Sequence, residues 1–396
     1  RGVVSNIDKT VNAIIESTAH ASKNSNVDIN RVHVGIAGAH INSLQHKGMI
    51  IRNDADLEIN QDDLDKLEKD MHKLSVSPGD KIIHVLPQDF TVDDEPGIVD
   101  PIGMAGVKLE GNYHIITGQI TAAKNIYKCV EKSGIKVSEL TLEPLASAHS
   151  VLSDEELEAG VVLVDIGGGT TDVAIFHENS IRHTAIIPYG GNIITEDIKE
   201  GCNFMKNQAE LLKTRFGSAL ADESTENEIV SIPGLRGREP KEISVKNLSM
   251  IINARDSEIL DLVYYEIKSS GLEKKLVGGI VITGRGALLK NITQLAEYIT
   301  CLDARIGYPN EHLAKGLVEE VKSPIYATAV GLVLKGLREN SEAYNDFMAQ
   351  EEVAVEADYA EMSSEDKDRS IKAERREHFF TKFKAWLKDE SDIKDF

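Results

Sequence analysis

The sequence predicts an α/β fold in two large domains or two lobes. The chain has 396 residues, 41% of them hydrophobic, which is enough for more than one hydrophobic core. A buried strand, a glycine-rich turn and a second strand occupy Val161–Phe176. A buried strand followed by another glycine-rich turn and a helix beginning near Ala287 occupies Gly278–Leu289. Apolar residues at helical spacing, as over Val245–Ser269, place helices among these strands.

Composition narrows the possible functions. The net charge of −21 argues against nucleic acid as the main partner, because phosphate contacts need a basic surface. The three cysteines lie far apart in the chain, at Cys129, Cys202 and Cys301, without metal-ligand or disulfide spacing. We therefore expect a reducing, cytoplasmic setting. No apolar run reaches the length of a membrane span, so we expect no transmembrane segment.

The turn after the first buried strand is a candidate phosphate-binding loop. Three successive glycines permit φ > 0 and let backbone N–H groups approach an anion, and two threonines add hydroxyl donors. The candidate residues are Gly167, Gly168, Gly169, Thr170 and Thr171. Asp165 lies where the strand ends, and there a carboxylate can hold a metal-bound water beside a phosphate. The alternative is a glycine-rich hairpin that binds no ligand.

A second candidate carboxylate lies at a junction between a strand and a helix. Glu143 follows the predicted strand Val137–Leu142 and precedes Pro144, which suits the first helical turn. From this position the side chain can project into a cleft. It can equally favour the helix N-terminus as a capping charge, and the residues alone leave both interpretations open.

The segment DIGGGTTDVAIF resembles the second phosphate loop of the actin-like ATPases. The resemblance implies two lobes around ATP and Mg²⁺, with Asp165 holding the metal through water and Glu143 orienting the attacking water. Glu210 and Lys213, three apart on one predicted helix, match the pair that flanks the adenosine in that superfamily. The activity implied is at most a slow ATPase.

The second glycine-rich turn resembles the adenosine loop of the same superfamily. Its candidate contacts are Gly284, Arg285 and Gly286. The superfamily usually has a small residue where Arg285 stands, although an arginine can stack on the base. Ser323–Leu332 matches the last element of the superfamily, a helix whose small residues permit close packing between the lobes.

The predicted organisation has several parts. They are a first lobe (1–40 and 122–159), an inserted α+β subdomain (41–121), a second lobe (160–202 and 271–338) with its helical and hairpin subdomain (203–270), an acidic disordered linker (339–370) and a terminal amphipathic helix (371–390). Within the insert we expect a short strand at Gly48–Arg52 and a helix capped by Asn60. The linker has few large apolar residues, so it cannot bury enough surface to order itself.

The terminal helix predicts contact with a membrane surface. Its apolar face consists of Phe379, Phe380, Phe383, Trp386 and Leu387, and its cationic rim includes Lys382, Lys384 and Lys388. This combination is typical of an interfacial helix on anionic lipid. The alternative is a helix that docks on the body of the protein or in a partner's groove.

Across nearly the whole chain the pattern resembles the FtsA family, the actin-like anchors of the bacterial division ring. The segments that carry the likeness are HVGIAGAHINS, HVLPQDFTVD, PGIVDPIGMAGVKLEG, EPLASAHSVL, IPGLRGREP and YATAVGL. The family implies a homopolymer at the cytoplasmic face of the inner membrane, at the septum, which binds anionic lipid, other division proteins and the C-terminal tail of FtsZ. Asn203–Ser270 would capture that tail, with Arg255 and Asn247 as candidate contacts.

Two other functions stay open at this stage: a PilM-like pilus-assembly protein, and a small-molecule kinase of the same superfamily. The actin-like pattern also begins with a hairpin and a first phosphate loop of the DxGT type, which is absent from the sequence beginning at Arg1. If this reflects truncation, we expect ATP between two lobes. If the chain is complete, we expect weak binding or none.

Overall fold

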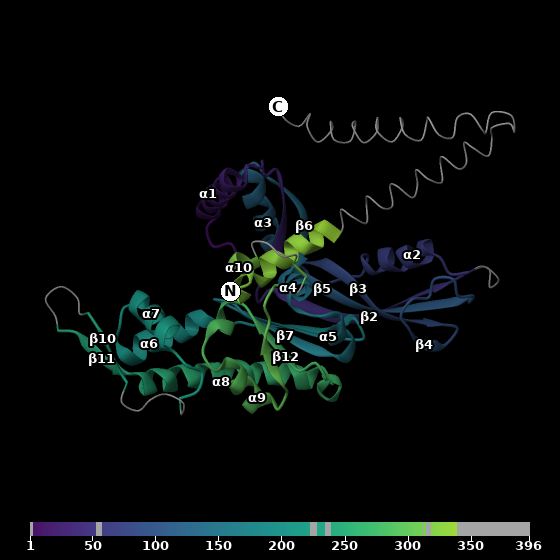
Figure 1. The fold of residues 1–396 in the computed structure, drawn as a ribbon. Coiled ribbons are helices and arrows are strands. Elements are labelled where there is room, and N and C mark those ends of the chain that lie inside the picture. Colours follow the sequence, from purple (N-terminus) through teal and green to yellow (C-terminus); the bar gives the residue numbers. More distant parts are fainter. Residues whose placement is uncertain are drawn as a thin grey trace, which may run out of the picture. The chain divides into compact units, whose positions relative to one another are not determined.

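The computed structural model describes residues 3–52, 58–221, 228–233, 239–310, 312–313 and 318–338 (Figure 1). The chain divides into two units, residues 1–335 and residues 336–396, and the second is described only over residues 336–338. The predicted linker (339–370) and terminal helix (371–390) lie outside the described residues. Among the helices that are described, none is long and apolar enough to cross a membrane.

A five-stranded sheet forms the centre of the second lobe. In spatial order its strands are β13 (Ala304–Ile306), β12 (Ile280–Thr283), β7 (Val161–Ile166), β8 (Thr171–His177) and β9 (Ser180–Ile187). Strand β12 runs parallel to both β7 and β13, whereas β7, β8 and β9 form an antiparallel meander. The predicted strand, tight turn and second strand over Val161–Phe176 are confirmed.

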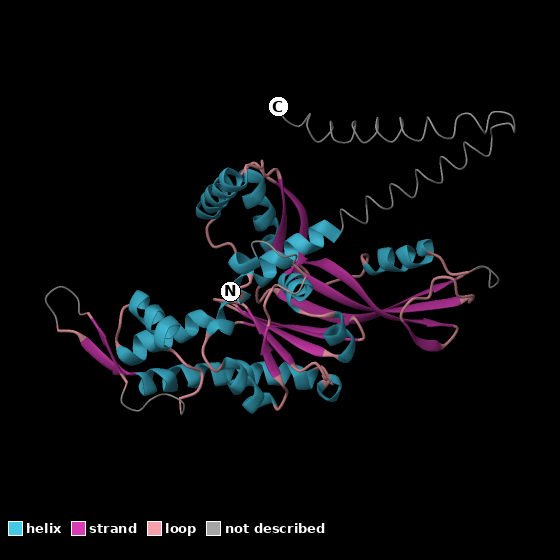
Figure 2. Cartoon of the chain, in the orientation of Figure 1, coloured by secondary structure: helices cyan, strands magenta, loops and turns pink. Residues whose placement is uncertain are grey.

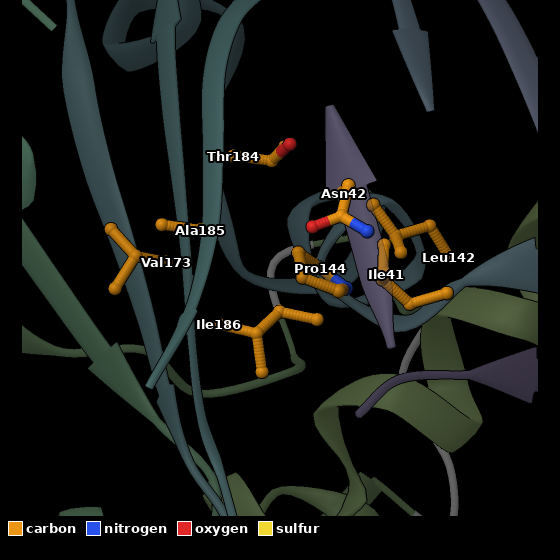
Figure 3. A pocket seen from close by; sticks show the side chains of 8 residues that line it. All are labelled: Ile41, Asn42, Leu142, Pro144, Val173, Thr184, Ala185 and Ile186. Atoms are coloured by element: carbon orange, nitrogen blue, oxygen red, sulfur yellow. The ribbon is translucent and has the colours of Figure 1, made fainter. Parts of the chain in front are cut away.

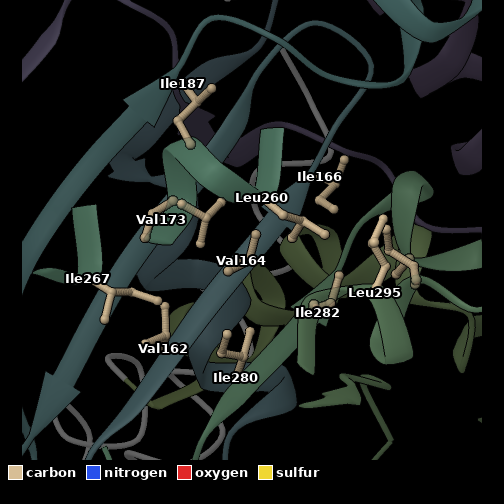
Figure 4. Close-up of a cluster of buried hydrophobic side chains, with 14 of the residues drawn as sticks. Val162, Val164, Ile166, Val173, Ile187, Leu260, Ile267, Ile280, Ile282 and Leu295 are labelled. Atoms are coloured by element: carbon tan, nitrogen blue, oxygen red, sulfur yellow. The ribbon is translucent and has the colours of Figure 1, made fainter. Parts of the chain in front are cut away.

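Both faces of this sheet are covered, which explains why β7 reads as a continuous apolar run. Val162 and Val164 face the helices α8 (Val245–Ser269) and α9 (Ile292–Thr300) in one core (Figure 4). Val161 and Leu163 face the opposite way, into a core shared with α4 (Glu143–Val151). All four side chains have no solvent exposure. This burial holds the end of β7, and with it the glycine loop, in one place.

The first lobe has a two-stranded parallel sheet with helices packed on it. Its elements are α1 (Ile7–Ser25), β1 (Arg31–Ile36), α3 (Ile120–Lys132), β6 (Lys136–Leu142), α4 and α5 (Asp154–Ala159). Strand β1 pairs with β6, and α1 packs on α3. Asn6 caps α1 by accepting a hydrogen bond from the Lys9 N–H.

The insert is a four-stranded antiparallel sheet with one helix against it (strands are magenta in Figure 2). In spatial order its strands are β2 (Ile41–Ile51), β5 (Lys108–Gln119), β3 (Asp80–Val92) and β4 (Glu95–Ile98). Helix α2 (Gln61–Met71) has the expected Asn60 cap and buries Leu67 against the sheet. The short strand expected at Gly48–Arg52 is wrong in length, because β2 pairs with β5 along all eleven residues. The first half of β2 is mostly polar and exposed, so it shows no hydrophobic pattern from which a strand could be predicted.

The helical subdomain of the second lobe contains α7 (Lys206–Phe216), the hairpin β10 (Ile229–Ile232) and β11 (Lys241–Ser244), and α8, and it packs against α6 (Gly191–Cys202). Ile198, Leu212 and Leu248 bring the three helices together in one core. The predicted hairpin is confirmed by four antiparallel pairs. Its predicted turn, Gly234–Arg238, lies outside the described residues.

The segment after β12 corrects one prediction. We expected a helix from about Ala287, but a 3-10 turn, Arg285–Leu288, comes first, and α9 begins at Ile292. Asn291 has φ 60, a left-handed conformation that separates the turn from the helix. The remaining short elements are the 3-10 turns Glu273–Lys275 and Pro324–Tyr326 and the helix α10 (Val318–Val321).

Residues 327–335 are helical and cross α4 at very short range. A Cβ placed on Gly331 would lie 1.7 Å from the Ala146 carbonyl oxygen, so no side chain fits between the two helices. This confirms the expected close packing between the lobes.

Candidate functional site

A cavity of about 400 Å³ lies among the loops at the end of β7. Its lining residues are Glu143, Asp165, Gly167, Gly168, Thr170, Asp172, Gly284, Arg285, Pro324, Ile325 and Thr328. The structure therefore brings together residues predicted from three separate stretches of sequence. The volume lies in the range of small-molecule sites. Five predicted nucleotide contacts do not line the cavity: Gly169, Thr171, Gly286, Glu210 and Lys213.

Backbone hydrogen bonds fix the glycine loop. The Gly167 N–H donates to the Thr170 carbonyl over 3.0 Å and closes the turn. From the start of α6, the Gly191 and Asn192 N–H groups donate to the Gly167 and Gly168 carbonyls over 2.9 and 2.8 Å. The carbonyls are thus tied back, while the N–H groups of residues 168–170 have no hydrogen-bond acceptor within the described part of the chain. Successive free N–H groups of this kind form an anion-binding nest.

The glycines in and around the loop differ in what they need. None of the three loop glycines has a positive φ, contrary to the freedom that we expected them to use, and a Cβ on Gly167 or Gly168 would meet its nearest neighbour at 3.2 or 3.3 Å. Gly190, just before α6, is needed for space, because its Cβ would lie 2.7 Å from the Gly167 carbonyl oxygen and 2.8 Å from that of Thr170. Gly284 combines both needs, because its φ is 80 and its Cβ would lie 2.2 Å from Asp165 Oδ1.

Two hydroxyl groups orient the Asp165 carboxylate. Ser147 Oγ, on α4, donates to Asp165 Oδ2 over 3.0 Å, and Thr328 Oγ1 donates to the same oxygen over 3.3 Å. The two hydroxyl oxygens are themselves 2.9 Å apart. Burial raises the pKa of Asp165, and both hydroxyls oppose that shift by favouring the charged form.

Two more carboxyl groups share the cavity. Burial, and then the charge of Asp165, raises the pKa of Glu143 to about 7. Burial, followed by the charges of Glu143 and Asp165, raises the pKa of Asp172 to about 7. Thr170 Oγ1 donates to Asp172 Oδ2 over 3.1 Å, whereas Asp172 Oδ1 is buried without a hydrogen-bond partner. Such a cluster favours a cation, because a positive charge stabilises all three carboxylates.

These carboxylates fit a cation that is held partly through water. Within the described ranges, no group of three or more His, Cys, Asp or Glu side chains is arranged to bind a metal ion directly. Mg²⁺ keeps several waters and commonly shares its remaining positions with phosphate oxygens. The prediction that Asp165 holds Mg²⁺ through water agrees with this chemistry.

Glu210 and Lys213 brace the loop from behind. Lys213 Nζ donates to the Gly191 carbonyl over 2.7 Å and to Thr195 Oγ1 over 2.8 Å, and it pairs with Glu210 Oε2 at 2.8 Å. Burial alone would raise the pKa of Glu210, but the hydrogen bonds from Lys213 and Thr195 outweigh it and leave that pKa lowered. The positive charge of Arg285, which lines the cavity, lowers the pKa of Glu210 further.

The two candidate partner contacts lie on α8. Arg255 Nε bonds Asp197 Oδ2 over 2.6 Å, and its guanidinium also pairs with Glu258 and lies 6.0 Å from the Tyr189 ring. Arg255 thereby ties α8 to α6. Asn247 is exposed, and its backbone N–H donates to Ser244 Oγ in the N-terminal cap of α8.

Sequence reasoning missed the groups that orient the carboxylates. Ser147 and Thr328 lie 181 residues apart, and only the folded chain brings them to Asp165. Asp172 was visible beside the loop, but its burial against two other carboxylates was not. The contact of Gly191 and Asn192 with the loop likewise joins segments more than twenty residues apart, and no local pattern indicates it.

The fold and the cavity define a protein of the actin-like class. A solved PilM–PilN type IV pilus biogenesis complex includes a chain with the same fold, at a TM-score of 0.54 and 13% identity, covering 85% of this chain and 87% of that one. At this identity the likeness concerns the fold alone. It therefore gives no support to a pilus-assembly function.

The sequence comparisons identify the family. The family model described as cell division protein FtsA matches residues 162–331, and that of the SHS2 domain inserted in FTSA matches residues 38–117. The cell division protein FtsA of Pseudomonas aeruginosa is 39% identical over 86% of this chain and 81% of its own length. That of Escherichia coli is 34% identical over 85% and 81%. The chain belongs to the FtsA family of cell division proteins, which confirms the resemblance and the insert.

Proposed function

We propose that this chain is an ATP-binding adaptor that polymerises and attaches FtsZ filaments to the cytoplasmic membrane at the septum. One observation carries the nucleotide part of the proposal. Gly168 and Thr170, whose N–H groups have no acceptor in the described part of the chain, line the same cavity of about 400 Å³ as three buried carboxyl groups, Glu143, Asp165 and Asp172. Backbone N–H groups that can bind an anion, beside carboxylates that can bind a cation, suit a phosphate group accompanied by Mg²⁺.

Each part of the site then has a role toward the nucleotide. The N–H groups of residues 168–170 bind phosphate oxygens, and Asp165 and Asp172 hold water around Mg²⁺, which neutralises phosphate charge when bound. We assign Arg285, which lines the cavity, to the adenosine, together with the pair Glu210 and Lys213 beside the start of α6. Glu143, with a pKa of about 7, can accept a proton from a water placed against the terminal phosphate. The chemistry supports a slow ATPase at most.

Calorimetric titration with Mg-ATP tests this site. We expect Asp165→Ala to weaken binding at least about tenfold, because the remaining carboxylates lose the group that both hydroxyls orient. Asp261→Ala, an exposed aspartate on α8, is the matched control and keeps the wild-type affinity. Equal affinity for the Asp165 variant would exclude Asp165 from the site. No binding to the wild-type chain would refute the proposed nucleotide site.

The membrane part rests on the sequence of residues 371–390. Five large apolar side chains on one helical face, surrounded by lysines, match an interfacial helix. In co-sedimentation with anionic vesicles, we expect Phe383→Asp and Trp386→Asp to abolish binding. Thr381→Asp makes the same charge change on the opposite face of the helix and should bind more strongly than either variant. If the wild-type chain stayed in the supernatant, the membrane proposal would be refuted, and the alternative of a protein-docking helix would be favoured.

The partner part concerns the helical subdomain. An acidic peptide, such as the proposed FtsZ tail, would have to compete with Asp197 and Glu258 for Arg255. Asn247 lies exposed on the same helix and can add a hydrogen bond. We expect Arg255→Glu to weaken binding of that peptide in fluorescence anisotropy. Unchanged affinity would move the peptide site away from this part of α8.

A further inference from the structure

One histidine of the insert reaches out of its own sheet. The pairing of β3 with β5 shifts between Ile82 and His84, so Ile83 is an extra residue in the ladder. A bulge of this kind turns the following side chain in a new direction. A Cβ on Gly118, in β5, would lie 2.6 Å from the Ile83 side chain, so the small residue gives the bulge room.

The redirected side chain contacts the backbone beside the candidate catalytic glutamate. His84 Nε2 accepts a hydrogen bond of 3.0 Å from the backbone N–H of Leu142. Leu142 is the N-cap residue of α4, and Glu143 is the first residue of that helix. The Leu142 side chain makes no capping hydrogen bond, so the polar contact at this junction comes from another subdomain.

Tight packing surrounds the same junction. Leu142 and Pro144 lie with Ile41 and Ile186 around a space of about 10 Å³, the size of a single water molecule (Figure 3). A Cβ on Gly35, in β1, would lie 2.9 Å from Glu143 Cγ. The side chains on both sides of Glu143 therefore have almost no freedom, and a shift of the backbone would move the carboxylate with it.

The charge state of His84 suits an acceptor. Nε2 accepts a hydrogen bond only when the ring is neutral and carries its proton on Nδ1. Burial, helped by the charge of Lys335 and opposed by that of Glu139, lowers the pKa of His84 to about 4. Lys335 is bonded to Glu139 and Thr141, on the strand that ends at Leu142. At neutral pH the acceptor is therefore present.

We propose that His84 is a positioning residue, through which the insert holds the Leu142–Glu143 backbone so that the Glu143 carboxylate faces the cavity. This inference deepens the proposed function and rests on it for the role of Glu143. It makes the inserted subdomain a structural part of the nucleotide site. A displacement of the insert that breaks the bond from His84 would then also displace Glu143.

Two variants at residue 84 test the inference in the full-length protein. His84→Phe fills the space without an acceptor, whereas His84→Gln retains an oxygen acceptor on a flexible side chain. In hydrogen exchange of the segment 140–146, we expect His84→Phe to raise the rate at the junction about tenfold, the ratio expected for one lost buried hydrogen bond. We expect His84→Gln to restore protection in part. His46→Phe, an exposed histidine on β2, is the matched control.

ATP turnover provides the functional measurement. We expect His84→Phe to lower kcat about tenfold with little change in KM, and His84→Gln to recover part of the rate. Unchanged exchange at the junction in His84→Phe would overturn the inference. So would raised exchange that leaves kcat unaltered. Failure of the wild-type chain to bind Mg-ATP would instead refute the proposed function, while hydrogen exchange would still decide whether His84 holds the junction.

Discussion

Replacing Asp256 by asparagine should stabilise the protein at alkaline pH far more than at acid pH. Asp256 lies on α8 with 2% of its surface exposed, and its Oδ2 has no hydrogen-bond partner. Burial raises its pKa from 3.8 to about 7, against an opposing effect of the Lys213 charge. The folded protein therefore binds this proton more tightly than the unfolded chain does. Tighter proton binding by Asp256 in the folded state stabilises the wild-type protein fully below about pH 4, and this contribution is lost as the pH rises through about 7.

The size of the effect follows from the pKa shift. A difference of roughly three units corresponds to about 4 kcal/mol between the charged and neutral forms. Between about pH 5 and pH 8, the part of this free energy that titrates is about 2 to 3 kcal/mol. Asparagine has nearly the shape of the protonated aspartic acid and does not ionise. The difference in unfolding free energy between Asp256→Asn and the wild type should therefore grow by that amount.

Guanidinium unfolding at the two pH values measures this difference directly. Glu143 and Asp172 also titrate near pH 7, but they are present in both proteins, so their contribution cancels in the comparison. Asp261→Asn, an exposed aspartate on the same helix, should show little change with pH relative to the wild type. A variant-minus-wild-type difference for Asp256 that is the same at both pH values would refute the reasoning.

Three further substitutions test the geometry around the cavity. Gly331→Ala should lower the unfolding free energy by about 3 kcal/mol or more, because its Cβ would lie 1.7 Å from the Ala146 carbonyl oxygen. The control Val333→Ala, at an exposed site on the same helix, should have little effect. Equal stability of the two variants would contradict the close crossing. Arg285→Ala should weaken Mg-ATP binding about tenfold in calorimetry through loss of the one lining cation, and an unaltered affinity would remove Arg285 from the site. Gly284→Ala should abolish Mg-ATP binding, since φ 80 and a Cβ 2.2 Å from the site carboxylate leave no room; retained binding would show that the loop can rearrange.

The sequence predicts well those elements whose pattern lies within one continuous segment. The strands β7 and β12 are buried on both faces, so their uninterrupted apolar runs identify them without knowledge of their neighbours. The predicted bounds of α8 agree with the observed Val245–Ser269, because its apolar stripe is long and begins at a serine cap. The glycine loop was identified in the same way, from one segment.

The parts that were missed depend on distant contacts. The exposed half of β2 has no hydrophobic alternation, and only its pairing with β5 makes it a strand. In the 3-10 turn at Arg285, Gly286 packs against Ile166 of β7, where a Cβ would lie 2.3 Å from Cγ2. His84 has no local pattern that would connect it with Leu142, 58 residues away. Such contacts follow from the packing of whole subdomains.

The crossing of residue 331 over Ala146 has a mechanical consequence. A contact without intervening side chains fixes the distance between the two helices at this point. Thr328, which lines the cavity, lies one helical turn away, about 5 Å along the axis. A rotation of about 10° about the contact would move atoms at that distance by less than ~1 Å, and atoms about 20 Å away by more than ~3 Å. The cavity lining next to the crossing would therefore change less than the distant parts of either helix.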